Sequence, residues 1–207
     1  MYSKLVSHVK LSPNCTKPRN HEIDTITIHC VVGQASVESL GALFASPSRQ
    51  ASSNYGIGYD GRIACYVEEE NRSWCSGNRE NDHRAITIEV ASDDQPPYAV
   101  KPEAYAALLD LLEDICRRHS IKLNFTGDKT GNMTLHKWFQ ATACPGQYLE
   151  SKHPEIEAEV NRRLGKKDVF YRVQVGAFNV KENAIALQDK LHEQGYKDAF
   201  IVEVPRT

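Results

Sequence analysis

Apolar and polar side chains alternate over residues 24–32 and again over residues 85–91. A period of two is typical of a β-strand, because successive side chains point to opposite faces of the sheet. The alternation therefore predicts two strands, with His29 among the polar positions of the first and Glu89 among those of the second. Cys30 falls in the apolar set, so its side chain is expected to point away from that of His29.

Turn and helix patterns complete the first part of the chain. Asp60-Gly61 lies between two strand-like runs and predicts a hairpin. Apolar residues follow helical spacing from Pro102 to residue 118, and proline is favoured at the first position of a helix. Shorter helices are predicted over residues 36–44 and 154–164. Strands and helices are therefore interspersed, as in an α/β fold.

The polar segment Gly165-Lys166-Lys167-Asp168 interrupts this pattern and predicts a domain boundary. Beyond it we expect a strand over residues 170–175, a helix over residues 181–194 and a second strand over residues 199–204. These elements form a small βαβ unit of about 40 residues, which is near the lower size limit for independent stability. The predicted domains are residues 1–165 and residues 168–207.

Composition and charge are those of a soluble globular protein. Of the 207 residues, 41% are hydrophobic and 25% are charged, and 25 Lys and Arg against 27 Asp and Glu give a net charge of −2. This balance argues against a nucleic-acid partner bound through a strongly basic surface. The sequence has no run of about 18 apolar residues, so no membrane insertion is expected. The start of the chain lacks the apolar segment of a secretory signal, so we expect the protein to accumulate in the cytoplasm.

The six cysteines include no Cys-x-x-Cys pair, and in a reducing compartment they are expected to be free thiols or metal ligands. Three residues are candidate zinc ligands: His29 near the end of a strand, His136, and Cys144 eight residues further on. Spacing alone leaves alternatives open, since a strand histidine is often structural and a cysteine before Pro-Gly can serve packing. The surrounding motifs favour the metal site.

Six short motifs occur in order along the chain. They are Thr-Ile-His-Cys at 27–30, Ser-Ser-Asn-Tyr-Gly-Ile-Gly-Tyr-Asp-Gly at 52–61, Ser-Trp-Cys-Ser-Gly-Asn at 73–78, Ile-Thr-Ile-Glu-Val at 86–90, Leu-His-Lys-Trp-Phe at 135–139 and Ala-Cys-Pro-Gly at 143–146. Together they resemble the zinc-dependent N-acetylmuramoyl-L-alanine amidases of the type-2 amidase family, which are related to peptidoglycan recognition proteins. The resemblance covers about residues 4–165 and is nearest to endolysins of phages and prophages of Gram-positive bacteria. It implies a central mixed β-sheet flanked by helices and a peptidoglycan substrate.

The resemblance implies that His29, His136 and Cys144 hold zinc, with water in a fourth position. Glu89 matches the glutamate of the family's Ile-Glu strand motif and is implied to accept the proton of that water and pass it to the leaving amine. Without the motif, Glu89 would be interpreted as a surface residue of a half-exposed strand. A purely structural zinc would need a fourth protein ligand, and the sequence offers no obvious one.

Two positions depart from the usual pattern of the family. Many relatives have a lysine two residues before the cysteine ligand, where this chain has Thr142. Its hydroxyl could donate a hydrogen bond to the oxyanion, weaker than the charge-assisted bond of a lysine. A tyrosine that lies near the zinc in relatives aligns with Ser53, which weakens the case for a phenolic catalyst.

Trp74 and Asn78 resemble the segment that lines the substrate groove, and Asn54 and Trp138 are weaker candidates for substrate contact. An indole and a carboxamide suit a ligand with sugar rings and peptide amides. The alternatives are that Trp74 is a core residue and that Asn78 serves a turn.

The run Val-Gln-Val-Gly-Ala-Phe at 173–178, followed by an alanine-containing helix and Gly195-Tyr196, resembles a SPOR repeat, a family that binds peptidoglycan glycan strands. A complete SPOR domain contains two βαβ halves, and the sequence shows one before Thr207. An open sheet edge and a half-covered core would then remain. We therefore expect residues 168–207 to pair with a second copy in a homodimer. The alternatives are docking on the amidase domain and an evolutionary remnant.

These inferences predict a zinc-dependent hydrolase that cleaves the amide between N-acetylmuramic acid and L-alanine, in the manner of an endolysin held in the cytoplasm until a holin opens the membrane. A host autolysin of the same chemistry is the nearest alternative. A non-catalytic peptidoglycan-binding protein is the alternative from another class. Cys144 argues against it, because loss of this cysteine usually accompanies loss of catalysis in the family.

Overall fold

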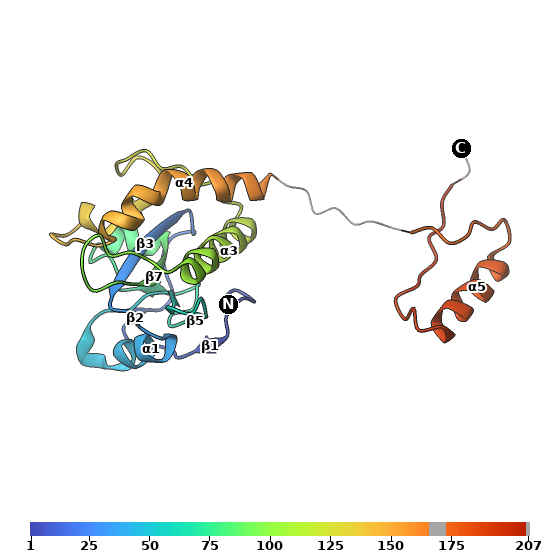
Figure 1. Ribbon diagram of the computed structural model, residues 1–207, viewed down its shortest axis with the longest axis horizontal. Helices are drawn as coiled ribbons and strands as arrows, with labels where there is room; N and C mark the ends of the chain where they lie inside the picture. Colours follow the sequence, from blue (N-terminus) through green and yellow to red (C-terminus); the bar gives the residue numbers. More distant parts are fainter. Residues whose placement is uncertain (166–172, 206–207) are drawn as a thin grey trace. The chain divides into compact units, whose positions relative to one another are not determined.

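The computed structural model describes residues 1–165 and 173–205. The chain divides into two compact units, Met1–Lys167 and Asp168–Thr207 (Figure 1). Within the described residues, no helix is both long enough and apolar enough to cross a membrane.

The first unit is built on a six-stranded mixed sheet with the strand order β1-β5-β4-β7-β3-β8. Its two long central strands, β3 (Thr25–Val32) and β7 (Ala85–Ser92), pair in parallel over their whole length. β8 (Met133–Leu135) pairs in parallel with β3, and β4 (Tyr55–Ile57) pairs in parallel with β7. The remaining strands of this sheet are β5 (Ile63–Cys65), which forms the predicted hairpin with β4, and β1 (His8–Val9). The predicted mixed sheet is confirmed.

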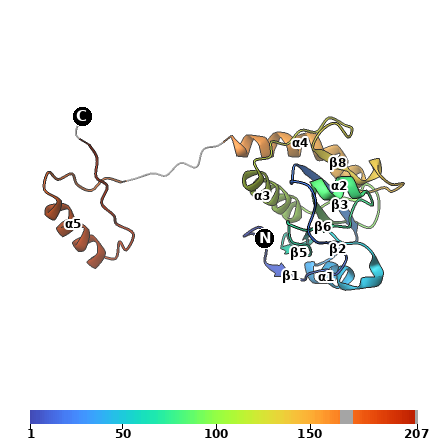
Figure 2. The same cartoon turned by 180° about the vertical axis from the view of Figure 1, so that it is seen from behind.

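Helices flank this sheet, as predicted. α3 (Pro102–His119) and α4 (Gly146–Leu164) lie side by side (Figures 1 and 2). Their apolar side chains share one core with the alternating isoleucines of β3 and β7, and removal of this surface from water stabilises the unit. This core includes Ile26, Ile28, Ile86, Ile88, Leu108, Leu112, Ile156 and Val160. α1 (Val37–Ala45) packs in a smaller cluster, which consists of Val37, Leu40, Phe44, Ala64 and Tyr66.

The structure differs from the prediction at the start of α4, which begins at Gly146 rather than at residue 154. Pro154 lies inside the helix, where it removes one backbone hydrogen-bond donor. Leu149 and His153 in the additional turns are completely buried, so tertiary packing keeps this segment helical despite the proline. α3, which has no internal proline, ends within one residue of its predicted limit.

The second face of the sheet is polar but buried. Thr27 and Thr134 on neighbouring strands hydrogen-bond each other at 2.8 Å, and the Asn81 side chain bonds both hydroxyls. Thr87 bonds Ser73 at 2.7 Å. Because these groups satisfy one another, the layer can be dry without a large desolvation cost. The small elements on this side are α2 (Arg79–Arg84) and a separate sheet of β2 (Cys15–Thr16) and β6 (Arg72–Ser73) (Figure 2). The first unit also contains two 3₁₀-helices, η1 (Pro47–Arg49) and η2 (His136–Trp138).

The second unit contains the predicted helix, α5 (Lys181–Glu193). The strand predicted over residues 170–175 falls partly outside the described residues, and residues 173–175 are not a strand. The prediction of a strand over residues 199–204 is wrong, because these residues form no sheet ladder.

Side chains of α5 bind the segment that was expected to be the last strand. Gln188 and His192 lie 2.8 and 3.0 Å from the carbonyl oxygen of Ala199, and Lys181 pairs with Glu203 at 2.7 Å. A strand is defined by a hydrogen-bonded neighbour, and a two-stranded sheet is marginal on its own. In the described part of this unit, side chains of α5 therefore contact this segment at Ala199 and Glu203.

Candidate functional site

The structure brings together the three residues that the sequence singled out as metal ligands. Nδ1 of His29 lies 3.4 Å from Sγ of Cys144, and the rings of His29 and His136 have centroids 4.9 Å apart at an angle of 60°. One ligand atom from each residue lies within 4.8 Å of those of the other two. The three side chains can therefore converge on one ion.

The sheet and one loop create this convergence. His29 lies near the carboxyl end of β3, and His136 directly follows the parallel strand β8. The carboxyl ends of parallel strands meet at one edge of a sheet, which is a frequent place for binding sites. Cys144 lies in the loop before α4. The Lys137 N–H donates to the Cys144 carbonyl at 3.2 Å, which ties this loop to η2.

The donor set suits a zinc ion. Burial lowers the pKa of His29 to about 3 and also lowers the pKa of His136, so both rings are neutral, which is the ligating form. Nε2 of His29 and Nε2 of His136 are buried and have no hydrogen-bond partner among the described residues. Two imidazoles and one thiol are ligands that zinc favours. The orphaned nitrogens and the chemistry of the set thus fit a bound cation.

Glu89 lies beside this cluster. It is the register partner of His29 in the parallel β3–β7 pair. Burial raises the pKa of Glu89 to about 8. Its Oε2 is buried and has no partner in the described part of the chain, whereas Oε1 lies 3.7 Å from Sγ of Cys75. A carboxylate with one free oxygen therefore faces the edge of the candidate metal centre.

Two cysteines that the sequence left as ordinary thiols belong to the site. The Cys30 thiol lies near that of Cys144, which also contacts His29. Cys75 forms a second cluster with His29 and Glu89, in which the ligand atoms again lie within 4.8 Å of one another. The sequence indicates this role of Cys75 only weakly. Cys75 lies in the motif at residues 73–78, in which Trp74 is the predicted substrate contact.

Gln140 is another neighbour that the sequence did not indicate. Its side chain lies near the His136 ring and against Gly77. Gly77 has a φ of +67°, and a Cβ at this position would overlap the Gln140 amide. The glycine therefore supplies both the left-handed turn and the space for this contact.

Thr142 lies at the exposed rim of the Cys144 loop. Its Oγ1 accepts a hydrogen bond from the Cys144 N–H at 3.2 Å. One role of this threonine is thus to shape the loop that presents the thiol. Ser53 is buried and donates to the Tyr55 carbonyl, so no phenol occupies its position.

The candidate groove residues divide into distinct cases. Asn54 is completely buried; its amide donates to the Val67 carbonyl at 3.1 Å and its Oδ1 accepts from the Thr87 N–H at 3.2 Å. The prediction that Asn54 contacts substrate is wrong, because its polar atoms are used inside the protein. Asn78 caps α2 by accepting a hydrogen bond from the Asn81 N–H at 2.9 Å. This agrees with the alternative that Asn78 has a structural role at a turn.

The two tryptophans are half-buried. The indole of Trp74 donates to Oγ1 of Thr16 at 3.0 Å, and Trp138 stacks on Phe125 with centroids 6.1 Å apart. Each ring therefore has a structural partner, and each leaves part of its surface accessible. Their contact with substrate stays a prediction.

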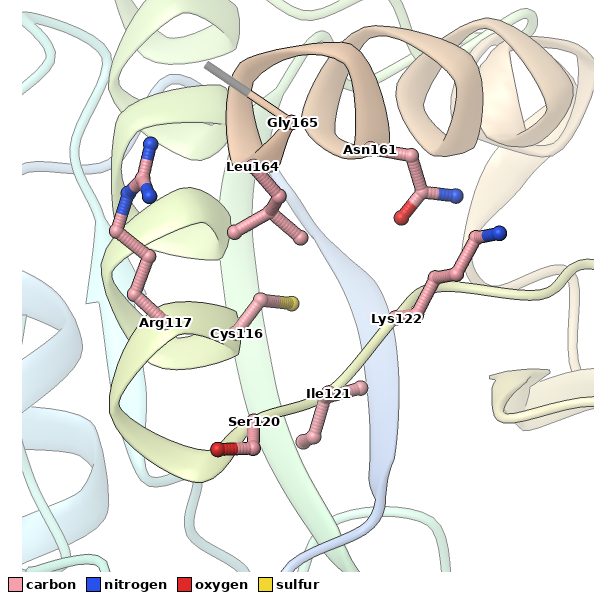
Figure 3. Close-up of a pocket in the computed structure, with 8 residues that line it drawn as sticks. All are labelled: Cys116, Arg117, Ser120, Ile121, Lys122, Asn161, Leu164 and Gly165. Atoms are coloured by element: carbon pink, nitrogen blue, oxygen red, sulfur yellow. The ribbon is translucent and has the colours of Figure 1, made fainter. Parts of the chain in front are cut away.

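An open surface pocket of about 570 Å³ lies elsewhere, at the ends of α3 and α4 (Figure 3). Its lining residues are Cys116, Arg117, Ser120, Ile121, Lys122, Asn161, Leu164 and Gly165. None of them belongs to the cluster around His29. The pocket is therefore separate from the candidate active site.

Solved structures share the fold of the first unit. The catalytic domain of XlyA is 18% identical, with a TM-score of 0.58, and the match covers 74% of this chain and 97% of that one. The endolysin amidase LysCS from Clostridium intestinale URNW is 16% identical, with a TM-score of 0.56 and coverage of 75% and 97%. Staphylococcus aureus hydrolase AmiA, in complex with its ligand, is 17% identical, with a TM-score of 0.58 and coverage of 76% and 82%. At these identities the similarity establishes the fold.

Family models match both parts of the chain. The model of the N-acetylmuramoyl-L-alanine amidases matches residues 19–147, and the SPOR domain model matches residues 149–206. No curated protein matches the chain. The amidase model spans more than half of the sequence and includes every residue of the candidate metal cluster. The chain therefore belongs to the N-acetylmuramoyl-L-alanine amidase family.

Proposed function

We propose that this protein is a zinc-dependent hydrolase that cleaves the amide between the lactyl group of N-acetylmuramic acid and L-alanine in peptidoglycan. One observation carries the proposal. The ligand atoms of His29, His136 and Cys144 converge to within 4.8 Å, and Glu89, the register partner of His29, has an oxygen without a partner in the described residues. A metal site beside a carboxyl group is an arrangement suited to hydrolysis of an unactivated amide.

His29, His136 and Cys144 would hold the zinc through two neutral imidazoles and a thiolate, which leaves a position open. When bound, zinc polarises the amide carbonyl and makes water more acidic. The Cys30 thiol lies next to Cys144 but is not among the three residues whose ligand atoms converge.

In its ionised form Glu89 acts as the general base, and in its protonated form it then acts as the general acid. Oε2 takes a proton from the attacking water as the new C–O bond forms, and it returns this proton to the nitrogen of L-alanine as the C–N bond breaks. An amide nitrogen must be protonated to leave, because its anion is too basic. The products are the lactyl carboxylate and a free amino terminus. Thr142 holds the Cys144 loop and offers its hydroxyl proton to the developing oxyanion.

The matches also support a role in cell-wall lysis. The SPOR match supports binding of glycan by the second unit. Several solved structures with this fold are named as endolysins, including those of LysCS and a mutant Bacillus subtilis endolysin. The proposed role is therefore that of an endolysin that reaches the wall from the cytoplasm after release by a holin.

Digestion of purified cell walls tests the reaction. We expect new amino termini of L-alanine to appear while reducing sugars stay constant. A chelator should abolish this release, and added zinc should restore it. Release of reducing sugars without L-alanine amino termini would instead indicate a glycosidase. The Glu89→Gln variant, loaded with zinc to the same extent, is the matched control.

A further inference from the structure

We propose that Cys75 is a positioning residue, whose thiol holds Oε1 of Glu89 and leaves Oε2 as the only oxygen that carries the proton. The inference rests on the general-base role proposed for Glu89. The two oxygens of this carboxylate have different surroundings. Oε1 lies 3.7 Å from Sγ of Cys75, and Oε2 is buried without a hydrogen-bond partner in the described parts of the chain.

Asp82 of α2 fixes the backbone that carries Cys75. Its carboxylate accepts from the Cys75 N–H at 3.1 Å, from the Ser76 N–H at 3.1 Å and from the Ser76 hydroxyl at 2.6 Å. Asp82 is only 1% exposed, so these bonds form in a dry environment, where they are stronger than at the surface. The residue that contacts Glu89 is therefore held by one hydrogen bond of its own N–H and by two of its neighbour Ser76.

An anchored oxygen changes what the carboxylate can do. The last torsion of a glutamate side chain is broad, so an unanchored carboxylate samples many orientations. Catalysis by a general base depends on holding the accepting oxygen within hydrogen-bond reach of the water. A bond to Oε1 restricts this rotation and keeps Oε2 aimed at one point.

A thiol suits this task because it orients the carboxylate without taking its proton. A neutral donor adds no charge beside the metal centre. It is also a weak donor, so the carboxylate remains basic.

The other buried thiols provide a matched control. Cys65 is completely buried in the apolar core, on β5. Its truncation removes a buried sulfur at a distance from the catalytic cluster. Any effect that is specific to Cys75 must therefore exceed the effect of Cys65→Ala.

The first test compares Cys75→Ala with Cys75→Ser and Cys65→Ala, in the full chain. We expect Cys75→Ala to lower kcat about 10-fold or more, as loss of a supporting contact does at other metal sites, with unchanged KM and zinc content. Cys75→Ser keeps a donor and should recover most of the loss. Cys65→Ala should keep the wild-type kcat. If kcat of Cys75→Ala stays within twofold of wild type, or if serine and alanine are equally impaired, Cys75 does not position Glu89.

The second test asks whether Cys75 acts through Glu89. In the Glu89→Gln background, Cys75→Ala should cause no further loss, because the group that it positions is gone. An equal fractional loss in both backgrounds would assign Cys75 an independent structural role. If Glu89→Gln alone keeps wild-type turnover, the proposed base fails. If Glu89→Gln lowers kcat while Cys75→Ala does not, the positioning role of Cys75 is contradicted and the base role of Glu89 is not. The infrared S–H band, which Cys75→Ser removes, should shift in Glu89→Gln whatever the activity.

Discussion

Sγ of Cys144 lies 3.4 Å from Nδ1 of His29, although 115 residues separate them in the chain. The sheet presents the histidine and a loop presents the thiol, so neither residue forms the site alone. The contact is therefore a property of the folded chain. It makes the loss of either side chain a test of metal binding.

Removal of Cys144 should remove the zinc. A site with two remaining ligands binds zinc far more weakly, so Cys144→Ala should fall from about one zinc per chain to a small fraction of it. Cys65→Ala, which removes a thiol from the core, should keep the full zinc content. Metal analysis after dialysis measures both. Equal zinc contents in the two variants would show that Cys144 is not a ligand. Added zinc should raise the Tm of the wild type but not of Cys144→Ala.

Glu89→Gln should separate metal binding from catalysis. The amide keeps the shape of the side chain but cannot take a proton, and loss of a general base costs about 10²–10⁴-fold in turnover. The zinc content should stay at the wild-type value, because Glu89 is outside the ligand cluster. Release of L-alanine amino termini is the measurement. Wild-type turnover in the zinc-loaded variant would remove Glu89 from the mechanism.

Glu89 should also make the metal-free protein less stable at alkaline pH. Burial raises its pKa from about 4.3 in an unfolded chain to about 8, so the folded state favours the protonated form. This contribution to stability is complete below the unfolded pKa and is lost as pH rises through about 8. As the pH rises from the unfolded to the folded pKa, the free energy of unfolding of metal-free wild type should therefore fall relative to that of metal-free Glu89→Gln. The difference should change by at most about 1.4 kcal/mol per pH unit. Denaturant titrations at several pH values measure this difference, and a constant difference would contradict the buried carboxyl.

Asn54→Ala should affect stability and leave substrate recognition intact. The side chain bonds the Val67 carbonyl and the Thr87 N–H inside the protein, and an unsatisfied buried group costs about 1–3 kcal/mol. Asn78→Ala is the comparison, because loss of a helix N-cap costs about 1 kcal/mol. We expect a larger fall in the free energy of unfolding for Asn54→Ala, with KM unchanged. A raised KM in a variant of normal stability would restore Asn54 to the groove.

The second unit should associate with a second copy of the chain. None of the residues of α5 is buried, and apolar side chains stand exposed on the flanking segments, including Val173 at 86%, Tyr196 at 64% and Val204 at 79%. Such exposure is unfavourable in water unless a partner covers it. Light scattering of the full chain should give about twice the mass of one chain. Val204→Asp should give a monomer, whereas Leu43→Asp in the first unit should not. A monomeric wild type would exclude the homodimer.

The central strands and the convergence of the three candidate ligands could be predicted because their signals are local. The alternation along β3 and β7 defines their two faces, and His29, His136 and Cys144 lie within short motifs. Asn54 was misassigned because sequence does not distinguish a carboxamide that faces a groove from one that bonds buried backbone. The strand over residues 199–204 was misassigned because alternation indicates a possible strand, whereas a strand forms only with a neighbour.

Cys75 was missed for a different reason. Its contact with Glu89 depends on Asp82, which sets the path of the backbone at residues 75 and 76 through hydrogen bonds to two N–H groups. No spacing rule encodes such a bond between a helix side chain and the preceding loop. A polar layer inside a fold is therefore the part of the structure that the sequence pattern describes least.

The register of β3 against β7 limits which substitutions of Glu89 the site can tolerate. His29 and Glu89 are direct partners in one parallel ladder, so the separation of their backbones is the interstrand distance of about 4.8 Å. Neither loop movement nor repacking of a helix can change that distance. The number of methylene groups then limits how far the carboxylate can reach from the strand. Aspartate, one methylene shorter, would keep the charge but lose the reach, and no relaxation of the sheet would restore it.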